Sequence, residues 1–547
     1  MTKDSTQNAD DLNRRRFVQW AGVGAAGGTL GLAGCLGGDG DGDDDEGPDD
    51  PADAPDDGEL QEGGTIVWGH SEVTQNLDPH QTATASTGRF LRSIYESLVG
   101  LDGNLELTTS PDGPSPGLAD DWSVSDDQLT YEFSLREGIT FHDGSTLTSD
   151  DVKYTYERMA DPETAAIMGF VMDPIDEIET PDDTTVVIEL EEVFQPFLRQ
   201  LAFSGTAIVP EGSGPDLGDE PVGTGPFEFD FRQQGNEARL EAFDDYWGEG
   251  PYLDAVEERT VTDPDSRLTG AETGDFHVIN DIPLNRIDEI VDTPDLQTEQ
   301  WTPLSWAFFN MNNAEEPFDD HDMRLAMDFA IDKEELVDGA LFGNGQPTAT
   351  PSYPDSPFRN NDLEPRPQDF DRAMEHVDAS PYDPEEYELE FKVTTNYPWH
   401  IDAAVIMREY FQELGFEVEL QRLQWGDWLE EVFQNQDFRI TMVNFFTFWE
   451  PDYLYHSVWG SEGSFNTRNY ASDRFDEAIR NARTAEGREE AITHYQDAQE
   501  IIHEDAPDVM LWYRDGTLAA DPSVGGLDTM LSPDNSQLNF KEVWLDE

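Results

Sequence analysis

Residues 131–144 decide the fold, and they read Tyr131-Glu132-Phe133-Ser134-Leu135-Arg136-Glu137-Gly138-Ile139-Thr140-Phe141-His142-Asp143-Gly144. From residue 129 to 135 apolar and polar side chains alternate, which predicts a half-buried strand. The turn after this strand leads to a helix start, because Thr148 and Asp151 stand at capping-box spacing. Behind the cap, Val152, Tyr156 and Met159 fall on one helical face. The stretch therefore predicts a strand, a turn and a helix in direct succession.

The same mixture of strands and helices continues on both sides of this stretch. Residues 64–69 have the composition of a strand, and residues 332–335 repeat the capping pattern of a helix start. A helix predicted over 402–414 ends at Gly415, and residues 416–420 then alternate as a strand. Mixed strands and helices without a tandem repeat predict an α/β architecture with several lobes. A length of 547 residues favours two or three domains.

The charge of the chain is strongly negative, since 31 Lys and Arg stand against 119 Asp and Glu, giving −88 at pH 7. Nucleic acid is therefore excluded as a partner, because phosphate binding needs a basic face. Like charges repel over a Debye length of about 8 Å at ordinary ionic strength, and about 1 M salt shortens that length to about 3 Å. Because 37% of the residues are apolar, the chain can still form packed cores. We infer adaptation to molar salt, as in halophilic archaea.

Residues 1–35 form a predicted export and lipidation signal. Arg14 and Arg15 precede a variable position and then a Phe, as in the twin-arginine export signal. The charge-free run that follows is rich in Gly and Ala, which is too weakly apolar for a good permanent membrane helix. Residues 32–35 match a lipobox, in which Cys35 is lipidated and becomes the mature N-terminus. Cys35 is the only cysteine, so no intramolecular disulfide can form; a chance free thiol is the alternative to lipidation.

Residues 36–60 are predicted to be a disordered acidic tether. The segment consists mainly of Gly, Asp and Pro, so it cannot bury apolar surface and its charges repel one another. Calcium binding is the alternative, but the tract lacks the fixed Gly and the terminal Glu of a calcium loop. With a lipid on Cys35, the tether would hold the folded part at the extracellular face of the cell membrane.

Short motifs from about residue 63 to the C-terminus carry a resemblance to a known family. In chain order they are Leu-Asp-Pro at 77–79, Ile-Tyr-Glu-Ser-Leu at 94–98, the block 131–144, Asp-Asp-Val at 150–152, Gly-Thr-Gly-Pro-Phe at 223–227, Tyr-Trp-Gly at 246–248, Phe-Asn-Met-Asn at 309–312, Arg-Leu-Ala-Met at 324–327 and Ala-Ile-Asp-Lys at 330–333. Each motif is weak alone, but the ordered set is specific. The chain resembles the extracellular solute-binding proteins of peptide- and nickel-type ABC transporters, which are family 5 of the solute-binding proteins.

The resemblance implies an α/β, two-lobed periplasmic-binding-protein-like fold of the Venus flytrap type with an additional small domain. By analogy, residues 61–100, 205–300 and 510–547 form lobe I, residues 301–509 form lobe II, and residues 101–204 form the small domain. The chain would cross between the lobes near 300 and 510, which makes a hinge. Ligand contacts both lobes only in the closed form, so binding shifts the open–closed population. The resemblance also implies a monomer without cofactor or metal that serves ABC permease subunits and their ATPases.

The resemblance further places residues 439–452 in the cleft. In peptide-binding relatives, a carboxylate a few residues before a Glu/Asp-Pro pair holds the α-ammonium of the peptide. Aligned on Glu450, that position is Thr447 in this chain. A hydroxyl accepts a hydrogen bond but brings no counter-charge, and loss of a desolvated charge partner costs about 3–5 kcal/mol. Asp452 and Glu72 are the candidates to substitute for the missing carboxylate.

Aromatic residues supply most of the other candidate ligand contacts. Trp425 falls where relatives have a pocket aromatic, Trp306 lies at the expected lobe crossing, and Glu72 lies where relatives contact the ligand from lobe I. With Phe446 and Trp449 these tryptophans would form a stacking surface for a sugar ring, an aromatic group or an apolar side chain. The alternative is core packing for the aromatic residues and a solvated acid for Glu72. The candidate ligand-binding residues are Glu72, Trp306, Trp425, Asn444, Phe446, Thr447 and Trp449.

The sequence contains no motif of an enzyme that we recognise. The triplet His142-Asp143-Gly144 looks catalytic, but in the family it is a structural loop. The ten histidines lack metal-ligand spacing such as H-E-x-x-H, and neither G-x-S-x-G nor a P-loop occurs. We therefore expect a binding protein for a peptide or peptide-like solute that catalyses nothing. The alternatives are an oligosaccharide, which the aromatic residues and Thr447 favour, a nickel chelate, a receptor that signals without transport, or a secreted hydrolase with unrecognised carboxylates.

Overall fold

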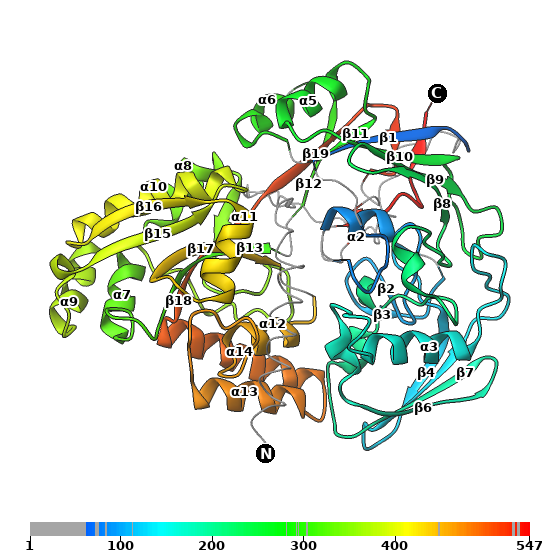
Figure 1. Cartoon of the computed structure of the whole chain (residues 1–547), viewed down its shortest axis with the longest axis horizontal. Helices are drawn as coiled ribbons and strands as arrows, with labels where there is room; N and C mark the ends of the chain where they lie inside the picture. Colours follow the sequence, from blue (N-terminus) through cyan, green and yellow to red (C-terminus); the bar gives the residue numbers. More distant parts are fainter. Residues whose placement is uncertain are drawn as a thin grey trace, which may run out of the picture.

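The described chain folds into three main β-sheets surrounded by helices (Figure 1). The computed structural model describes residues 62–71, 76–82, 85–111, 113–280, 282–291, 293, 295–301, 305–446, 449–527, 531–532 and 537–546. The predicted signal with Arg14, Arg15 and Cys35, the predicted tether, Glu72 and Thr447 lie outside the described residues.

The first sheet has seven strands. They are β1 (Thr65–His70), β8 (Phe227–Gln233), β9 (Glu237–Ala242), β10 (Ala255–Thr260), β11 (Val278–Ile279), β12 (Gln297–Trp301) and β19 (Gly516–Ala520), in the order β12-β19-β11-β1-β10-β9-β8. β1 runs parallel to β10 and β11, whereas β19 runs antiparallel to β11 and β12. The helices α2 (Ala85–Leu91), α5 (Pro264–Glu272) and α6 (Ile287–Val291) belong to this half of the molecule.

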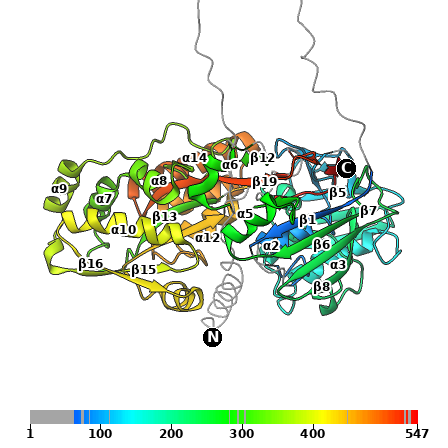
Figure 2. The ribbon, with the colours of Figure 1, turned by 90° about the horizontal axis from the view of Figure 1, so that it is seen from above.

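The second sheet has six strands. They are β13 (Ser305–Met311), β14 (Gly345–Pro347), β15 (Glu388–Thr394), β16 (Glu417–Leu423), β17 (Ile440–Phe446) and β18 (Asp508–Arg514), in the order β14-β18-β13-β17-β15-β16. β15 runs parallel to β16 and β17, and β13 runs antiparallel to β17 and β18. Figure 2 shows this half beside the half that carries the first sheet.

Helices cover both faces of the second sheet. They are α7 (His321–Ala330), α8 (Lys333–Leu341), α9 (Phe370–Ala379), α10 (Pro398–Glu413), α11 (Trp425–Trp428), α12 (Asp452–Trp459), α13 (Asp473–Arg483) and α14 (Arg488–Asp505). On one face Phe309 shares a core cluster with Leu336 of α8 and Phe411 of α10. On the other face Phe308 shares a cluster with Trp459 of α12 and Tyr495 of α14. Alternate side chains of β13 thus pack into two separate cores, as expected for a sheet covered on both sides.

The third sheet is antiparallel, with the order β4-β5-β7-β6. Its strands are β4 (Ala119–Val124), β5 (Thr130–Leu135), β6 (Ile175–Asp182) and β7 (Thr185–Leu190), and α3 (Ser149–Ala160) packs against it. Short helices complete the helical part of the described chain: the 3-10 helices η1 (Gly169–Met172), η2 (Ser204–Thr206), η3 (Pro215–Gly218), η4 (Leu284–Arg286) and η5 (Pro384–Glu386), the π-helix η6 (Leu429–Gln434) and the α-helix α4 (Phe197–Gln200). The remaining short strands form two-stranded sheets: β2 (Gly100–Leu101) with β3 (Leu107–Thr108), β20 (Val524–Gly525) with β23 (Trp544–Leu545), and β21 (Leu531–Ser532) with β22 (Gln537–Leu538).

The elements predicted from local patterns are confirmed. β5 covers the alternating stretch, and α3 follows it with Val152, Tyr156 and Met159 buried. The Asp151 carboxylate accepts the Thr148 main-chain N–H at 2.7 Å, which closes the first turn of α3. The predicted cap of α8, the helix before Gly415 and the strand after it are also present, as α8, α10 and β16. The mixed strands and helices agree with the predicted α/β class.

The carboxyl ends of the parallel strands in the first two sheets point toward the places where the chain passes between them. In the first sheet β12 ends at Trp301, which pairs with Gly516 at the start of β19. In the second sheet Ser305 at the start of β13 pairs with Phe446 at the end of β17. The chain passes from β12 to β13 through residues 302–304 and returns from β18 to β19 at Asp515. The carboxyl edges of the first and second sheets therefore lie next to the two places where the chain passes from one sheet to the other.

A buried carboxylate joins several of the sequence motifs. Glu96 accepts hydrogen bonds from Thr224 Oγ1 at 2.8 Å, Tyr246 OH at 2.9 Å and Trp247 Nε1 at 2.7 Å. Burial raises the pKa of Glu96 to about 7. A Cβ on Gly223 would lie 2.1 Å from a main-chain oxygen, so only glycine permits this close approach. Motifs far apart in sequence thus converge because they build one structural joint.

The loop at His142 belongs to the same joint. The main-chain N–H of His142 donates to the Gly223 carbonyl at 3.0 Å, and its ring Nε2 donates to the Gly225 carbonyl at 3.0 Å. Burial lowers the pKa of His142 to about 4, so the ring is neutral and holds the loop in place. The loop is structural, as the sequence interpretation expected.

Candidate binding site

Aromatic and polar side chains gather at the carboxyl edge of the second sheet. Trp425 begins α11 directly after β16, and its ring stacks on Trp428 with centroids 5.3 Å apart at 13°. The Tyr397 ring stands edge-on to Trp425 at 6.1 Å, from the loop between β15 and α10. Ligands of open α/β sheets bind beyond the carboxyl ends of the strands, where loops present their side chains. Trp425 is half-buried, so it combines ring packing with an accessible surface.

A second group at this edge centres on His400. Its Nε2 lies 2.6 Å from Asn444 Oδ1, so a neutral imidazole donates there and leaves Nδ1 as an acceptor. Burial lowers the pKa of His400 to about 4, which keeps the ring neutral. Tyr397 packs edge-on against His400 at 5.0 Å and links this pair to Trp425. Three segments, around Tyr397, Trp425 and Asn444, are therefore brought together at one end of the sheet.

A positive charge lies at the same edge. The Arg514 guanidinium, at the end of β18, stands over the Trp399 ring at 4.5 Å. The next residue, Asp515, is the crossing back to the first sheet. Burial raises the pKa of Asp515 to about 6, against the opposing effect of Arg514. The Arg514 guanidinium is therefore a buried cation beside the crossing.

The other candidate residues have mixed positions. Trp306 is fully buried, with its ring 6.0 Å from each of Phe308 and Trp459, which is the core-packing alternative. The Phe446 backbone ends β17 at the carboxyl edge. Trp449 follows shortly after, but it is buried against a ring from residues 101–204 and is described below. Glu72 and Thr447 lie outside the described residues.

The Asp452 carboxylate is engaged in a structural ion pair. Arg483 donates to its two carboxylate oxygens at 2.8 and 2.9 Å, and Tyr495 OH donates to one of them at 3.0 Å. Its side chain is 1% exposed. The suggestion that Asp452 replaces the missing carboxylate at Thr447 is therefore wrong in this conformation, because its charge is already neutralised.

The facing edge of the first sheet carries a buried polar group. His70, at the end of β1, has Nδ1 3.6 Å from the Glu258 carboxylate and Nε2 3.4 Å from the Arg89 guanidinium. Beside it, Trp68 Nε1 donates to Asn280 Oδ1 at 3.0 Å. Residues 72–75, which follow β1, include the candidate Glu72. The polar group therefore holds the end of β1 in place.

Sequence reasoning missed Tyr397, Trp399, His400 and Arg514. A signal was present for the first three, because they follow an apolar strand and open a helix with Pro398 in its first turn. Arg514 has no comparable signal, since its position depends on the pairing of β18 with strands two hundred residues earlier. Among the described residues, no group of three His, Cys, Asp or Glu could hold a metal ion, and no helix could span a membrane.

A family model described as bacterial extracellular solute-binding proteins, family 5 Middle, matches residues 113–466. The chain belongs to this family. Among curated proteins, the glutathione-binding protein GsiB of Pectobacterium atrosepticum is 28% identical over 451 residues, covering 80% of this chain and 86% of that protein. GsiB of Salmonella typhimurium is 26% identical over 445 residues, covering 79% and 85%.

Solved structures show that the fold is that of two-lobed family 5 binding proteins. DppA of Helicobacter pylori in complex with the peptide STSA has a TM-score of 0.77 at 24% identity, covering 89% of this chain and 99% of that one. AppA of Bacillus subtilis in complex with a nonapeptide has a TM-score of 0.74 at 23% identity, covering 89% and 100%. NikA of Staphylococcus aureus in complex with Ni(L-His)2 has a TM-score of 0.74 at 19% identity, covering 88% and 100%. The predicted fold class is confirmed.

Proposed function

We propose that this family 5 protein is the substrate-binding component of an ABC importer. It captures a peptide or peptide-like solute outside the cell by closing its lobes, and it delivers the solute to the membrane permease without catalysing a reaction. The observation that carries the proposal is the group of Tyr397, His400, Trp425 and Asn444 at the carboxyl edge of the second sheet, which faces the first sheet across the two crossings. A solute between these edges contacts both lobes only when they close.

Glutathione and other small acidic peptides are the first solutes to consider. The curated relatives are named glutathione-binding proteins. The Arg514 guanidinium lies at this edge over the Trp399 ring, and the half-buried Trp425 ring supplies apolar surface for the body of a short peptide. Thr447, by contrast, offers no counter-charge to an ammonium group. Oligosaccharides and nickel chelates are the alternatives in the same family.

The proposed location of the protein and its salt environment rest on its N-terminal sequence and its composition. The lobe boundaries, the monomeric state and the lipid anchor on Cys35 after twin-arginine export are part of the proposal. The anchor and the tether 36–60 hold the binding lobes at the extracellular face of the membrane, within reach of the permease. The net charge of −88 suits that position in molar salt.

Calorimetric titration in molar salt tests the binding site. The panel contains glutathione, di- and tripeptides, oligosaccharides and nickel–histidine. Trp425→Ala should weaken binding of the recognised solute at least tenfold, because it removes ring surface at the carboxyl edge. Trp122→Ala is the matched control, since Trp122 is a half-buried tryptophan on β4 of the third sheet. Equal affinities for the two variants would refute the placement of the site, and no binding across the panel would refute the capture of these solutes.

A genetic test separates transport from signalling. If a permease encoded beside this protein is deleted, uptake of the recognised solute should stop. Uptake that continues at the normal rate would favour a receptor that signals through another membrane partner.

A further inference from the structure

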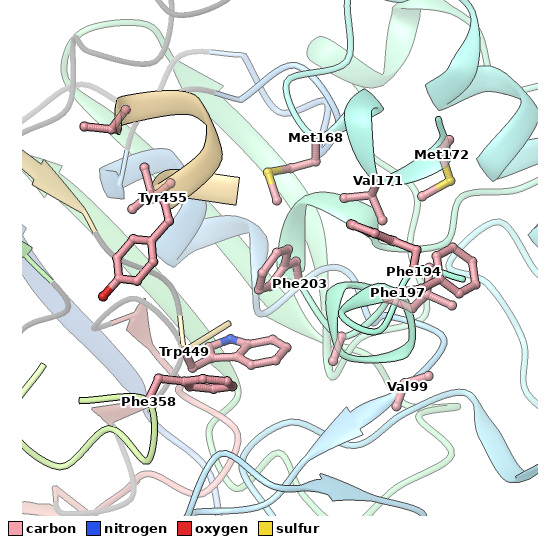
Figure 3. Close-up of a cluster of buried hydrophobic side chains, with 14 of the residues drawn as sticks. Val99, Met168, Val171, Met172, Phe194, Phe197, Phe203, Phe358, Trp449 and Tyr455 are labelled. Atoms are coloured by element: carbon pink, nitrogen blue, oxygen red, sulfur yellow. The ribbon is translucent and has the colours of Figure 1, made fainter. Parts of the chain in front are cut away.

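The segment 101–204, which carries the third sheet, packs directly on the half of the molecule that carries the second sheet. The Phe170 ring of η1 lies parallel to the Tyr453 ring of α12, with centroids 3.8 Å apart at 8°. The Phe203 ring meets Trp449 edge-on at 4.7 Å. Figure 3 shows Phe203 next to Trp449, with Phe194 and Phe197 farther from Trp449 in the same cluster. The two parts therefore share one apolar core cluster.

Charged groups continue the contact beside these rings. The Arg199 guanidinium stands over the Trp449 ring at 4.9 Å, and its Nε lies 3.4 Å from the Glu450 carboxylate. The same guanidinium lies 3.3 Å from Glu106, which also contacts Arg488 at 2.5 Å. Acidic and basic side chains thus alternate across the boundary in the order Glu450, Arg199, Glu106, Arg488. The Arg199 and Glu450 side chains are 7% and 0% exposed, and burial raises the pKa of Glu450 to about 8 against the opposing effect of Arg199.

Polar contacts extend the boundary toward the loop between α13 and α14. The main-chain N–H of Gln195 donates to the Arg483 carbonyl at 2.8 Å, and the Arg483 guanidinium stands over the Phe194 ring at 5.5 Å. Gln128 Nε2, from the turn before β5, donates to the Glu486 carbonyl at 3.3 Å.

The segment 101–204 is fixed to the first sheet's half on its other side. The Leu118 N–H donates to the Ser97 carbonyl at 3.1 Å, and the Ala119 N–H donates to the Leu98 carbonyl at 2.9 Å. The loop at His142 docks on Gly223 and Gly225, as described above. Because these hydrogen bonds tie the segment to the first sheet's half, rotation of the halves about the crossing at Asp515 would separate it from Trp449 and Tyr453.

We propose that this boundary is a latch: the docking of segment 101–204 on Trp449, Glu450, Tyr453 and Arg488 holds the lobes closed in the absence of solute. The inference assumes the lobe closure of the proposed function but goes beyond it, because only Trp449 among the latch residues is also a candidate ligand contact. A closed population that exists before binding raises the apparent affinity, since the solute need not supply all of the closing free energy. Apart from Trp449, the latch residues thus affect the apparent affinity for the solute through lobe closure, without contacting the solute directly.

The distance between two spin labels tests the latch without any solute. The full chain carrying Cys35→Ser receives cysteines at two exposed positions, Glu179 on β6 and Glu477 on α13, and is refolded from denaturant in molar salt to remove bound solute. Pulsed electron paramagnetic resonance then gives the populations of short and long distances. The solute-free protein should show mainly the short distance. A mainly long distance would overturn the proposal.

Variants identify the residues of the latch. Tyr453→Ala should lower the ratio of short to long distances at least tenfold, because it removes the parallel ring pair with Phe170. Arg488→Gln should lower the ratio by a smaller factor of about two to five, since its pair with Glu106 is partly exposed. Phe231→Ala is the control, because Phe231 is 40% exposed on β8 of the first sheet.

The outcomes distinguish the latch from the proposed function. Near-ultraviolet circular dichroism checks that each variant folds, and Arg488→Gln keeps the test valid if Tyr453→Ala does not fold. Ratios in both latch variants equal to that of Phe231→Ala would overturn the latch, whether or not a solute binds. A solute-free short distance together with no binding in the solute panel would support the latch and refute the proposed function.

Discussion

Replacement of Glu96 should strongly destabilise the joint between the sequence motifs. Glu96→Ala removes the acceptor of three buried donors, the Thr224 and Tyr246 hydroxyls and the Trp247 indole N–H. Each buried polar group left without a partner costs about 1–3 kcal/mol, so the three together cost about 3–6 kcal/mol after partial relaxation. That is a large fraction of the 5–15 kcal/mol, roughly, by which folded domains are stable.

Glu96→Gln is the matched variant. Its amide oxygen can still accept from Thr224 and Trp247, and its NH2 group can donate to the Tyr246 hydroxyl oxygen. We expect a change in the free energy of unfolding below about 1 kcal/mol for this variant. Denaturant unfolding in molar salt, followed by tryptophan fluorescence, measures both. Glu96→Ala with near wild-type stability, or Glu96→Gln as unstable as Glu96→Ala, would refute the hydrogen-bonded joint.

The raised pKa of Glu96 adds a dependence on pH. The folded protein holds the proton up to a pKa of about 7, whereas the unfolded chain releases it near 4.5. Between these values the folded state binds more protons, so its stability contribution is greatest below pH 4.5 and falls by about 3 kcal/mol as the pH rises to 7. Glu96→Gln should remove this slope. A slope in the difference between wild type and Glu96→Gln that is absent or reversed would contradict the buried, uncharged carboxyl.

Three further predictions concern stability and location. Arg468→Met should lower the free energy of unfolding by about 3–5 kcal/mol, because it leaves the buried Asp508 carboxylate, 2.9 Å from Arg468 in the native protein, without its cation. Denaturant unfolding measures this loss, and a loss below about 1 kcal/mol would contradict the prediction. Transfer from molar salt to dilute buffer should lower the melting temperature, since screening of the net charge of −88 is lost, whereas an unchanged melting temperature would remove the inference of salt adaptation. Cys35→Ser should move the exported protein from the membrane to the medium fraction, and retention of the variant on membranes would argue against the lipid anchor.

The fold was predictable where local chemistry and ordered motifs agree. The capping pair Thr148 and Asp151 and the alternation before it gave the strand and the helix directly, because both depend on neighbours in sequence. The chain order of motifs such as 94–98, 223–227 and 246–248 indicated the family, and the structure supplies the reason, which is their common contact at Glu96.

The candidate site was only partly predictable. The approximate locations of Trp425 and Asn444 came from the resemblance, but sequence distance hid their link through Tyr397 and His400. Trp306 looks the same in sequence whether it faces solute or core, and only the pairing of β13 between β17 and β18 places it among Phe308 and Trp459. The ion pair of Asp452 with Arg483 joins different helices, so no local pattern reveals that this carboxylate is occupied.

Capture of a solute is tested most directly by mass spectrometry of the protein purified from its native host in molar salt. Under native conditions the spectrum should contain the protein with one small peptide-like molecule, and denaturation should release that molecule for identification. The Trp425→Ala variant, expressed and purified in the same way, should carry much less of it, whereas Trp122→Ala should carry the normal amount. Wild-type protein that leaves its host without a bound small molecule, and that then binds nothing in the solute panel, would contradict the account.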